Sequence, residues 1–315
     1  MLPGTATTSE GELGMLKQHS DAELDVPGQF RLLRRLDVRE GETGVGGRVN
    51  TTIGVVVDVE TSGLGAGDVI VELALRRFRC DPDGLIVKID RSYSWLEDPG
   101  RELPADIVRL TGITDADLAG QAIDDDAVVR LLSSADFVCA HNAAFDRGHI
   151  ERRLPAAAGL NWACSCADID WRASAFDGRS LGWLLAQAGF FHGAHRARDD
   201  VDAVIALLAH QLPSGRTALS EMLATARSPS WRFRAIGAAF ELKDVLRGRG
   251  YRWDGEREPK CWWRDVPDAR RTEEEWWLAG HIYSVDARPK ALGPIIEKVT
   301  WRERYAPAPR PAGRP

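Results

Sequence analysis

The sequence has no run of about 18 apolar residues, the length that a membrane-spanning helix needs, so we expect no transmembrane segment. Its first 20 residues also lack the apolar core of a signal peptide, so we expect a cytoplasmic protein. Cysteine is scarce and odd in number, with five residues among 315. Only Cys164 and Cys166 are neighbours, and a single Cys-x-Cys is a poor zinc site. These absences favour reduced thiols over a disulfide framework or a zinc centre.

The formal net charge is −6, which argues against a nucleic-acid partner when the chain is taken as a whole. The charge is unevenly distributed, however. Residues 214–315 hold 20 Lys and Arg against 14 Asp and Glu, whereas residues 1–213 hold 21 against 33. The same C-terminal third contains 7 of the 11 tryptophans. This asymmetry predicts a second module with a different role from the rest of the chain.

The length suggests one large or two ordinary domains, and a hydrophobic content of 44% is typical of a globular protein. Changes in composition divide the chain into four parts. They are a largely disordered segment at 1–50 with a short docking element at 29–38 and a Gly-rich linker at 39–50, a main domain at 51–213, a small basic, Trp-rich α+β module at 214–305, and a Pro-rich tail at 306–315.

Apolar runs separated by turn residues predict an α/β main domain. Its expected strands are 53–59, 69–79, 85–95, 137–140 and 163–169, and its expected helices are 104–110, 124–132, 143–154, 181–188 and 200–210. The turn Asp81-Pro82-Asp83-Gly84 predicts that the second and third strands are antiparallel. In the C-terminal module we expect helices at 217–226, 241–249 and 273–282, a strand at 232–235 and a hairpin at 251–263.

Two carboxylates stand at the end of the first expected strand. Asp58 and Glu60 follow an apolar run that is typical of a strand buried on both faces. Side chains two residues apart on a strand point to the same face, so these two lie about 6.6 Å apart at Cα. Like charges that are close and half buried repel each other and lose hydration. A divalent cation would make the arrangement favourable, and carboxylate oxygens select Mg²⁺ or Mn²⁺.

Two later stretches carry further carboxylates beside histidines. One is His141-Asn142-Ala143-Ala144-Phe145-Asp146, directly after the expected strand at 137–140. The other is His195-Arg196-Ala197-Arg198-Asp199-Asp200, at the start of the expected helix at 200–210. Asp200 shares a helix face with Val204 and Leu207, so we expect it to point towards the core. Each stretch alone also fits a solvated strand end or an ordinary surface histidine.

Taken together, the three stretches resemble the motifs of the DEDDh (DnaQ-like) 3′–5′ exonucleases, a family that includes the proofreading subunit of bacterial DNA polymerase III. Residues 58–64 match Asp-x-Glu-Thr-Thr/Ser-Gly-Leu, residues 141–146 match His-Asn-x-x-Phe-Asp, and His195 with Asp200 matches the third motif. The resemblance covers residues 50–212 and implies an α/β, ribonuclease H-like fold, with a mixed five-stranded sheet flanked by helices.

The resemblance also implies roles for the site residues. Asp58, Glu60 and Asp200 would hold the first of two divalent cations, Mg²⁺ or Mn²⁺. Asp146 would help to order the second cation. His195 would be the general base that takes a proton from the attacking water, a task that suits an imidazole near neutral pH.

Other residues of the motifs are implied to contact substrate. The turn formed by Thr61, Ser62, Gly63 and Leu64 would bind the terminal 3′-OH and place its leucine under the last base. Asn142 resembles a further substrate-contacting position. We expect Asp199 to be a solvated neighbour or a helix cap, and His141 to be structural, because the general-base role is already filled.

These residues predict a metal-dependent 3′–5′ exonuclease that removes nucleotides from DNA 3′ ends in proofreading or repair. Its partners would be single-stranded DNA ends and replication or repair proteins, in a nucleoid-associated location. One alternative is a 3′–5′ exoribonuclease with the same chemistry. Another is a non-catalytic nucleic-acid- or clamp-binding adaptor, against which the full set of four carboxylates and one histidine argues. No clear clamp-binding peptide or polymerase region is visible.

The C-terminal module interleaves arginine with tryptophan between Phe240 and Trp263, and it resembles a small module behind some bacterial exonucleases. Such a composition suits stacking on single-stranded bases and pairing with phosphates. The favoured alternative is that the tryptophans form the core of this module, because small domains depend on large aromatic side chains.

Overall fold

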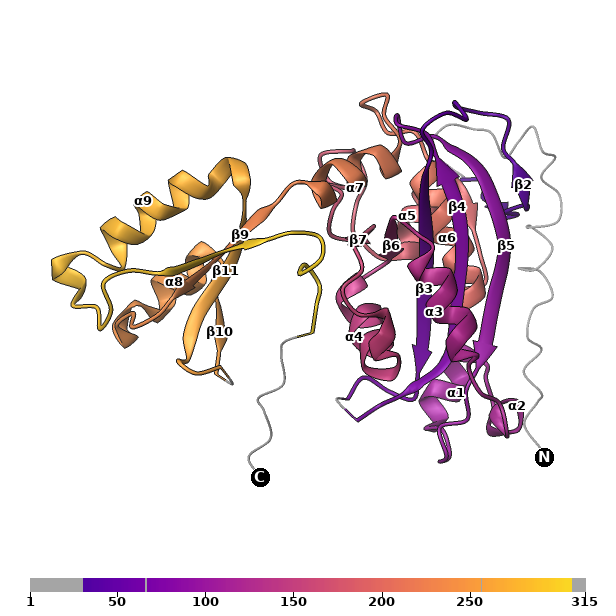
Figure 1. Cartoon of the computed structure of the whole chain (residues 1–315), viewed down its shortest axis with the longest axis horizontal. Coiled ribbons are helices and arrows are strands. Elements are labelled where there is room, and N and C mark those ends of the chain that lie inside the picture. The colour runs from indigo at the N-terminus through magenta and orange to yellow at the C-terminus, as the bar shows by residue number, and fades with distance from the viewer. Residues whose placement is uncertain (1–30, 66, 256, 308–315) are drawn as a thin grey trace, which may run out of the picture.

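The computed structural model describes residues 31–65, 67–255 and 257–307, so the disorder expected at 1–28 and most of the Pro-rich tail lie outside the described residues. A larger α/β body and a smaller C-terminal body are visible (Figure 1). The larger body contains β1 (Arg34–Arg35), β2 (Gly41–Glu42), β3 (Thr52–Thr61), β4 (Ile70–Cys80), β5 (Ile86–Leu96), α1 (Ala105–Thr111), α2 (Asp115–Leu118), α3 (Asp125–Ser133), β6 (Phe137–Ala140), α4 (Ala143–Arg153), β7 (Trp162–Cys164), α5 (Leu181–Gln187), β8 (Phe190–Phe191), α6 (Ala197–Ala209) and α7 (Ala218–Arg227).

The main sheet is mixed, with the strand order β2-β5-β4-β3-β6-β7. Strands β2 to β5 pair in antiparallel fashion, whereas β6 is parallel to both β3 and β7. This arrangement confirms the predicted mixed sheet flanked by helices, and the five expected strands are β3 to β7. A sixth strand, β2, lies in the segment expected to be a linker. It forms because Gly41 and Glu42 pair with the otherwise open edge of β5.

The fifth expected strand is shorter than predicted. The prediction covered 163–169, but β7 ends at Cys164. The chain turns there because the Asp168 carboxylate accepts the Cys164 N–H at 2.8 Å, while the Asp168 N–H bonds back to the Cys164 carbonyl at 2.8 Å. A side chain that bonds to nearby backbone in this way competes with the sheet ladder and ends the strand.

Helices cover both faces of the main sheet. Helices α5, α6 and α7 pack on one face, where Val204 and Leu208 of α6 meet Phe78 and Cys139 of the sheet. Helix α3 packs on the other face through Val128 and Leu132, and α4 joins it there. None of the helices within the described ranges is long and apolar enough to cross a membrane.

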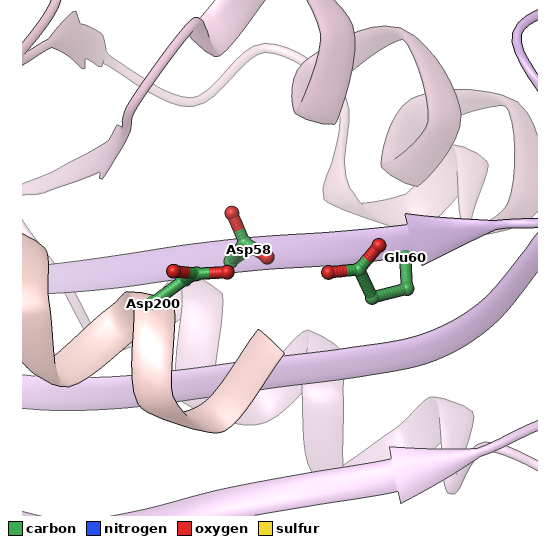
Figure 2. A group of neighbouring side chains, drawn as sticks. All are labelled: Asp58, Glu60 and Asp200. Atoms are coloured by element: carbon green, nitrogen blue, oxygen red, sulfur yellow. The ribbon is translucent and has the colours of Figure 1, made fainter. Parts of the chain in front are cut away.

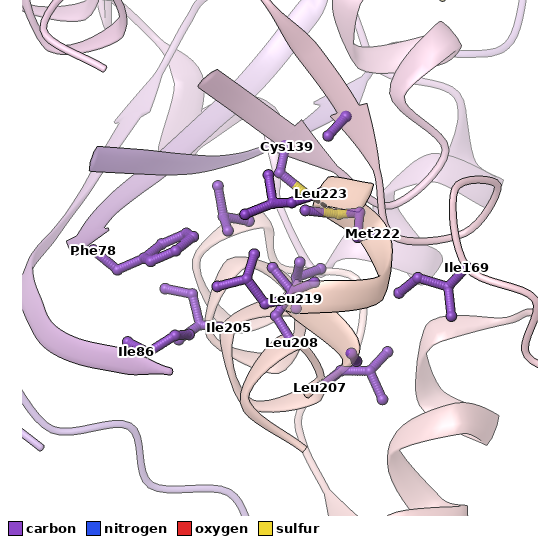
Figure 3. Close-up of a cluster of buried hydrophobic side chains, with 14 of the residues drawn as sticks. Phe78, Ile86, Cys139, Ile169, Ile205, Leu207, Leu208, Leu219, Met222 and Leu223 are labelled. Atoms are coloured by element: carbon purple, nitrogen blue, oxygen red, sulfur yellow. Dashed lines mark hydrogen bonds between the residues drawn. The ribbon is translucent and has the colours of Figure 1, made fainter. Parts of the chain in front are cut away.

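Helix α7 belongs to the core of the larger body. Its Leu219, Met222 and Leu223 point into the same buried cluster as Cys139 and Leu208 (Figure 3). The sequence analysis placed this helix in the C-terminal module, because the basic, Trp-rich composition begins near residue 214. Composition does not report which body an amphipathic helix packs against.

The smaller body is an antiparallel sheet with helices on one face. Its elements are β9 (Ser230–Ala235), α8 (Lys243–Arg249), β10 (Arg252–Asp254), β11 (Cys261–Pro267), α9 (Arg271–His281) and β12 (Ile295–Val299), with the strand order β10-β11-β9-β12. Phe233, Leu246, Leu278 and Ile282 form its core. Strand β12 was not predicted from the sequence.

The tryptophans of the smaller body divide between packing against its core and exposure to solvent. Trp231, Trp262 and Trp277 lie against its core, whereas Trp253 and Trp276 are exposed by 54% and 76%. Three of the six tryptophans in this body therefore pack against its core, as the aromatic-core alternative predicts, and two rings are accessible to solvent.

After β12 the chain returns to the larger body. The Trp301 carbonyl accepts the Trp162 N–H of β7 at 2.9 Å, and Arg147 donates to the carbonyls of Arg302 and Arg304 at 2.8 and 2.7 Å. The smaller body is therefore attached to the larger one at both of its ends. We propose that the module proper spans 230–299, narrower than the 214–305 expected from composition.

Candidate active site

Strand β3 places the first two carboxylates. Asp58 and Glu60 lie within β3, opposite Ala74 and Glu72 of β4. Valines at positions 55, 57 and 59 fill the buried cluster on the other face of the sheet. The alternation of a strand therefore directs both carboxylates to the face that α6 covers.

Helix α6 supplies the third carboxylate. Asp58, Glu60 and Asp200 each offer an oxygen atom that lies within 4.8 Å of the others (Figure 2). Asp200 stands one turn into α6, and its side chain is 13% exposed. The structure thus brings together residues that are about 140 positions apart in the sequence. Three hard oxygen ligands at such spacing fit a divalent cation.

Asp146 lies close enough to Asp58 for its charge to act on it. It stands in the first turn of α4, is 2% exposed, and its Oδ1 accepts the Val59 N–H at 3.1 Å. It is not one of the three residues whose oxygen atoms meet within 4.8 Å. Its charge nevertheless contributes to the raised pKa of Asp58, so the four carboxylates form one electrostatic group.

Burial and repulsion between like charges raise the pKa of three of these carboxylates, those of Asp58, Glu60 and Asp146. Burial, followed by the charges of Asp146, Asp200 and Glu60, raises the pKa of Asp58 well above its usual value. Burial and the charge of Asp200 raise the pKa of Glu60 from its usual 4.5 to about 7. Burial likewise raises the pKa of Asp146 from 3.8 to about 8. Positive charge at the centre of the group would reverse these shifts, so the residues present fit the predicted cations.

The two histidines near Asp200 contact it differently. His195, the predicted general base, has an exposed side chain, and its backbone N–H donates to Asp200 Oδ2 at 3.1 Å. Its backbone is left-handed, with φ of 67°. His192 is the closer imidazole, with Nε2 at 2.6 Å from Asp200 Oδ1 and a side chain that is 6% exposed. Sequence reasoning did not single out His192, because it lies outside the spacing of the third motif.

The chain forms a turn at His141 and Asn142, the first two residues of the second motif. His141 bridges Ser165 Oγ at 2.9 Å and the Arg179 carbonyl at 2.7 Å, and burial lowers the pKa of its imidazole. These contacts agree with a structural His141. Asn142 is exposed in the left-handed region, with φ of 81°, where asparagine is tolerated better than most residues. Its predicted contact with substrate stays a prediction.

The proposed substrate turn is held by a residue that sequence reasoning missed. The Asp68 carboxylate accepts hydrogen bonds from Ser62 Oγ at 2.9 Å and from the Gly65 N–H at 2.7 Å, and it pairs with Arg101 at 2.7 Å. A Cβ atom at Gly63 would lie 2.6 Å from the same carboxylate, so glycine is needed for this approach. Leu64 is left 88% exposed.

Thr61 completes this turn, because its hydroxyl donates to the Gly63 carbonyl at 2.7 Å. Asp199 is exposed beside the site, as expected for a solvated neighbour of Asp200. The turn therefore presents an exposed leucine immediately after the strand that carries Asp58 and Glu60.

Comparisons with known proteins agree with the geometry. A family model described as exonuclease matches residues 55–208. DNA polymerase III PolC-type from Listeria welshimeri is 42% identical over 98 residues, which are 30% of this chain and 6% of that protein. Ribonuclease T from Shewanella frigidimarina is 30% identical over 115 residues, which are 32% of this chain and 52% of that protein.

Two solved structures are also similar. Exonuclease X in complex with 5′-overhanging duplex DNA is 26% identical, with a TM-score of 0.39 over 55% of this chain and 99% of that one. E. coli exonuclease I in complex with an oligonucleotide is 16% identical, with a TM-score of 0.46 over 80% of this chain and 64% of that one.

The chain spans a small part of the PolC-type proteins and about half of ribonuclease T. The family match covers β3 to α6, which are the elements that carry all four carboxylates and His195. Residues 55–208 of this chain are therefore an exonuclease domain of the DEDDh (DnaQ-like) family.

Proposed function

We propose that this protein is a metal-dependent 3′–5′ exonuclease that removes nucleotides from DNA 3′ ends, in proofreading or repair. The observation that carries the proposal is the convergence of Asp58, Glu60 and Asp200 on one face of the sheet, with the charge of Asp146 acting on Asp58. Burial and neighbouring negative charges raise the pKa of Asp58, Glu60 and Asp146, which is unfavourable in a structural core, so the assembly points to a functional site.

The carboxylates are placed to hold two divalent cations, Mg²⁺ or Mn²⁺. Asp58, Glu60 and Asp200 would hold one, and Asp58 and Asp146 the other. When bound, such cations neutralise phosphate oxygens, activate water and stabilise the leaving oxygen in phosphodiester hydrolysis. The carboxylates fix their positions in advance, because they project from a buried strand and a packed helix.

Side chains around the carboxylates supply the remaining roles. His195 is exposed directly before α6, where it can receive a proton from the attacking water. The exposed Leu64 follows Glu60 in the turn after β3, where it can pack against a terminal base. The hydrogen bonds that Asp68 accepts from this turn would hold Leu64 and the groups that contact the 3′-OH in one geometry. These placements support hydrolysis from a free 3′ end.

RNA is the second candidate substrate. The 30% identity with ribonuclease T favours it, whereas the 42% identity with the PolC-type DNA polymerase favours DNA. A DNA substrate would place the protein with replication or repair proteins at the nucleoid. The non-catalytic adaptor is less well supported, because an adaptor would not need to retain four mutually repelling carboxylates.

Digestion of end-labelled substrates tests the proposal. Single-stranded DNA, duplex DNA and RNA of one sequence are incubated with the protein in Mg²⁺, Mn²⁺ or EDTA. We expect a ladder of products shortened from the 3′ end, faster on DNA, and none in EDTA. A circular single strand and a 3′-blocked oligonucleotide should resist. Faster loss of RNA would assign the second candidate, and nicking of the circle would instead indicate an endonuclease.

A further inference from the structure

Glu72 is a buried carboxylate that the proposed chemistry does not use. It lies on β4, directly opposite Glu60 in the β3–β4 register, and it is 1% exposed. A buried charge of this kind must be paired and hydrogen-bonded to be tolerated. What it pairs with therefore indicates why it is there.

The partners of Glu72 lie at the first residues of α6. Arg196 donates from Nε to Oε2 at 3.1 Å and from Nη2 to Oε1 at 3.3 Å, and the Ala197 N–H donates to Oε2 at 3.2 Å. Ser94 of β5 supplies a fourth donor at 3.0 Å. Arg196 occupies the N-cap position but makes no side-chain cap bond, so Glu72 satisfies an N–H that a helix ordinarily leaves open.

The contact between Glu72 and the start of α6 connects the sheet, which carries Asp58 and Glu60, with the helix that carries Asp200. Glu72 is fixed by the sheet next to Glu60, and it bonds to Arg196 and Ala197, the N-cap and first residue of the helix whose first turn carries Asp200. A shift of α6 along β4 would break these bonds and move Asp200 away from Asp58. Burying a charge such as that of Glu72 seldom adds net stability even when the charge is paired, so a geometric role explains the contact better than a stabilising one.

We propose that Glu72, through Arg196 and Ala197, is a positioning residue that holds Asp200 in register with Asp58 and Glu60. The inference rests on the proposed function, because it assigns Glu72 to the metal site of that reaction. Positioning groups behind metal ligands typically alter metal affinity by about 10- to 100-fold when they are removed.

Mn²⁺ binding measured by calorimetry tests this role without relying on activity. In Glu72→Leu the Kd for Mn²⁺ should rise at least about tenfold. In Glu72→Gln, which keeps an acceptor and the same volume but removes the charge, it should stay within about threefold of wild type. If Glu72 acted only through its charge, both variants would weaken binding equally, and that result would overturn the proposal.

In Arg196→Leu, positioning and electrostatics change the affinity for Mn²⁺ in opposite directions. This variant also provides the test if Glu72→Leu does not fold. Arg196 is 48% exposed at its side chain, so its replacement threatens folding less. Removing a positive charge from beside the site should by itself strengthen Mn²⁺ binding. The proposal predicts the opposite, a Kd raised at least about tenfold. Unchanged or tighter Mn²⁺ binding with weaker DNA binding would make Arg196 a substrate contact and refute the positioning role.

Asp202→Leu is the matched control. Asp202 forms a second ion pair between α6 and β4, with Arg76 at 2.7 Å, and it lies further along the helix. Its loss should leave the Kd for Mn²⁺ within about twofold, even if the melting temperature falls as much as in Glu72→Leu. A parallel loss of Mn²⁺ affinity in the control would show that Glu72 is merely structural. Absence of nuclease activity in the wild type would refute the proposed function, while these affinities would still decide the role of Glu72.

Discussion

The Nε2 atom of His192 lies 2.6 Å from Oδ1 of Asp200, whereas His195 reaches the same carboxylate only through its backbone N–H, 3.1 Å from Oδ2. Both carboxylate oxygens of Asp200 are therefore contacted by the short segment that directly precedes α6. The two imidazoles differ in what they can do. The buried His192 is placed to orient Asp200, and the exposed His195 is placed to exchange a proton with water.

The first prediction separates these roles. His195→Ala should lower kcat by about 10²- to 10⁴-fold, because it removes the proposed general base, while Mn²⁺ affinity is retained. His192→Ala should instead weaken Mn²⁺ binding by about tenfold, because Asp200 loses its orienting bond. Steady-state kinetics on an oligonucleotide and calorimetry with Mn²⁺ measure both. A His195→Ala enzyme with an unchanged rate at neutral pH would remove His195 from the mechanism.

The second prediction concerns the stability of the metal-free protein. Asp58→Asn removes one charge from a cluster in which burial and the charges of Asp146, Asp200 and Glu60 raise the pKa of Asp58. In EDTA, the melting temperature of this variant should equal or exceed that of the wild type. Added Mn²⁺ should raise the melting temperature of the wild type and have little effect on the variant. A variant that is clearly less stable in EDTA would mean that Asp58 is a structural residue.

The third prediction is the pH dependence of that stability. The pKa of Glu60 is raised from 4.5 to about 7 and that of Asp146 from 3.8 to about 8. Between the usual and raised values the folded chain keeps protons that the unfolded chain releases, so stability falls as pH rises. In EDTA, the melting temperature should decline from pH 5 to pH 8, and more shallowly in Glu60→Gln.

The same scan in excess Mn²⁺ provides the control for pH. Cations bind the ionised carboxylates, so the stabilisation by Mn²⁺ should grow as pH rises through the same window. An identical pH slope in the wild type and in Glu60→Gln would show that this carboxyl does not titrate in the window.

The fourth prediction tests the returning segment after β12. Arg304 pairs with the buried Asp168 at 3.3 Å and donates to the Ser228 carbonyl at 2.7 Å, and Tyr305 donates to the same carboxylate at 2.7 Å. Arg304→Ala should lower the free energy of unfolding by about 3 kcal/mol, because it leaves a buried charge short of a partner. The exposed neighbour Arg302→Ala should change it by less than about 0.5 kcal/mol. Chemical denaturation measures the free energy of unfolding of both variants. Equal losses would contradict a specific stabilising role for the Arg304 contacts.

The fifth prediction concerns the module at 230–299. Ser230 and Val299 are opposite each other in the β9–β12 pair, so a short Asn-Gly turn can join them after residues 231–298 are removed. This design keeps α7 and the returning segment, both of which a deletion of 214–305 would take from the larger body. The shortened protein should fold and hydrolyse short oligonucleotides at a rate close to that of the full chain.

A nucleic-acid role for the module would appear with longer substrates. Affinity for long single strands should then fall on excision, together with the salt dependence of binding. The exposed Trp253 and Trp276 would be the rings whose fluorescence responds to DNA. Unchanged affinity and salt slope would favour a structural or protein-binding role.

The grouping of the carboxylates could be predicted from the sequence because these residues lie in short local patterns. The alternation of β3 places Asp58 beside Glu60, and the helical period turns Asp200 inward. Glu72, His192 and Asp68 could not be found in this way. Their roles depend on which strand, helix or turn folds against them, and each is an ordinary polar residue in its own segment.

The limits of the fold prediction have the same origin. Strand β2 exists only because β5 leaves an open edge, and α7 joins the larger body only because its apolar face fits there. The end of β7 depends on the Asp168 carboxylate, four residues away. Local patterns predicted the type of most elements, whereas tertiary contacts decided their ends and their partners.

The most direct test of the central claim is cleavage of 5′-labelled single-stranded DNA in Mn²⁺ by the wild type and by Asp58→Asn. The account predicts a 3′-shortened ladder from the wild type and none from the variant, since loss of a carboxylate central to the site should cost several kcal/mol, with about 1.36 kcal/mol for each tenfold in rate. A variant that retains more than about a tenth of the wild-type rate would contradict a hydrolytic metal centre built on Asp58.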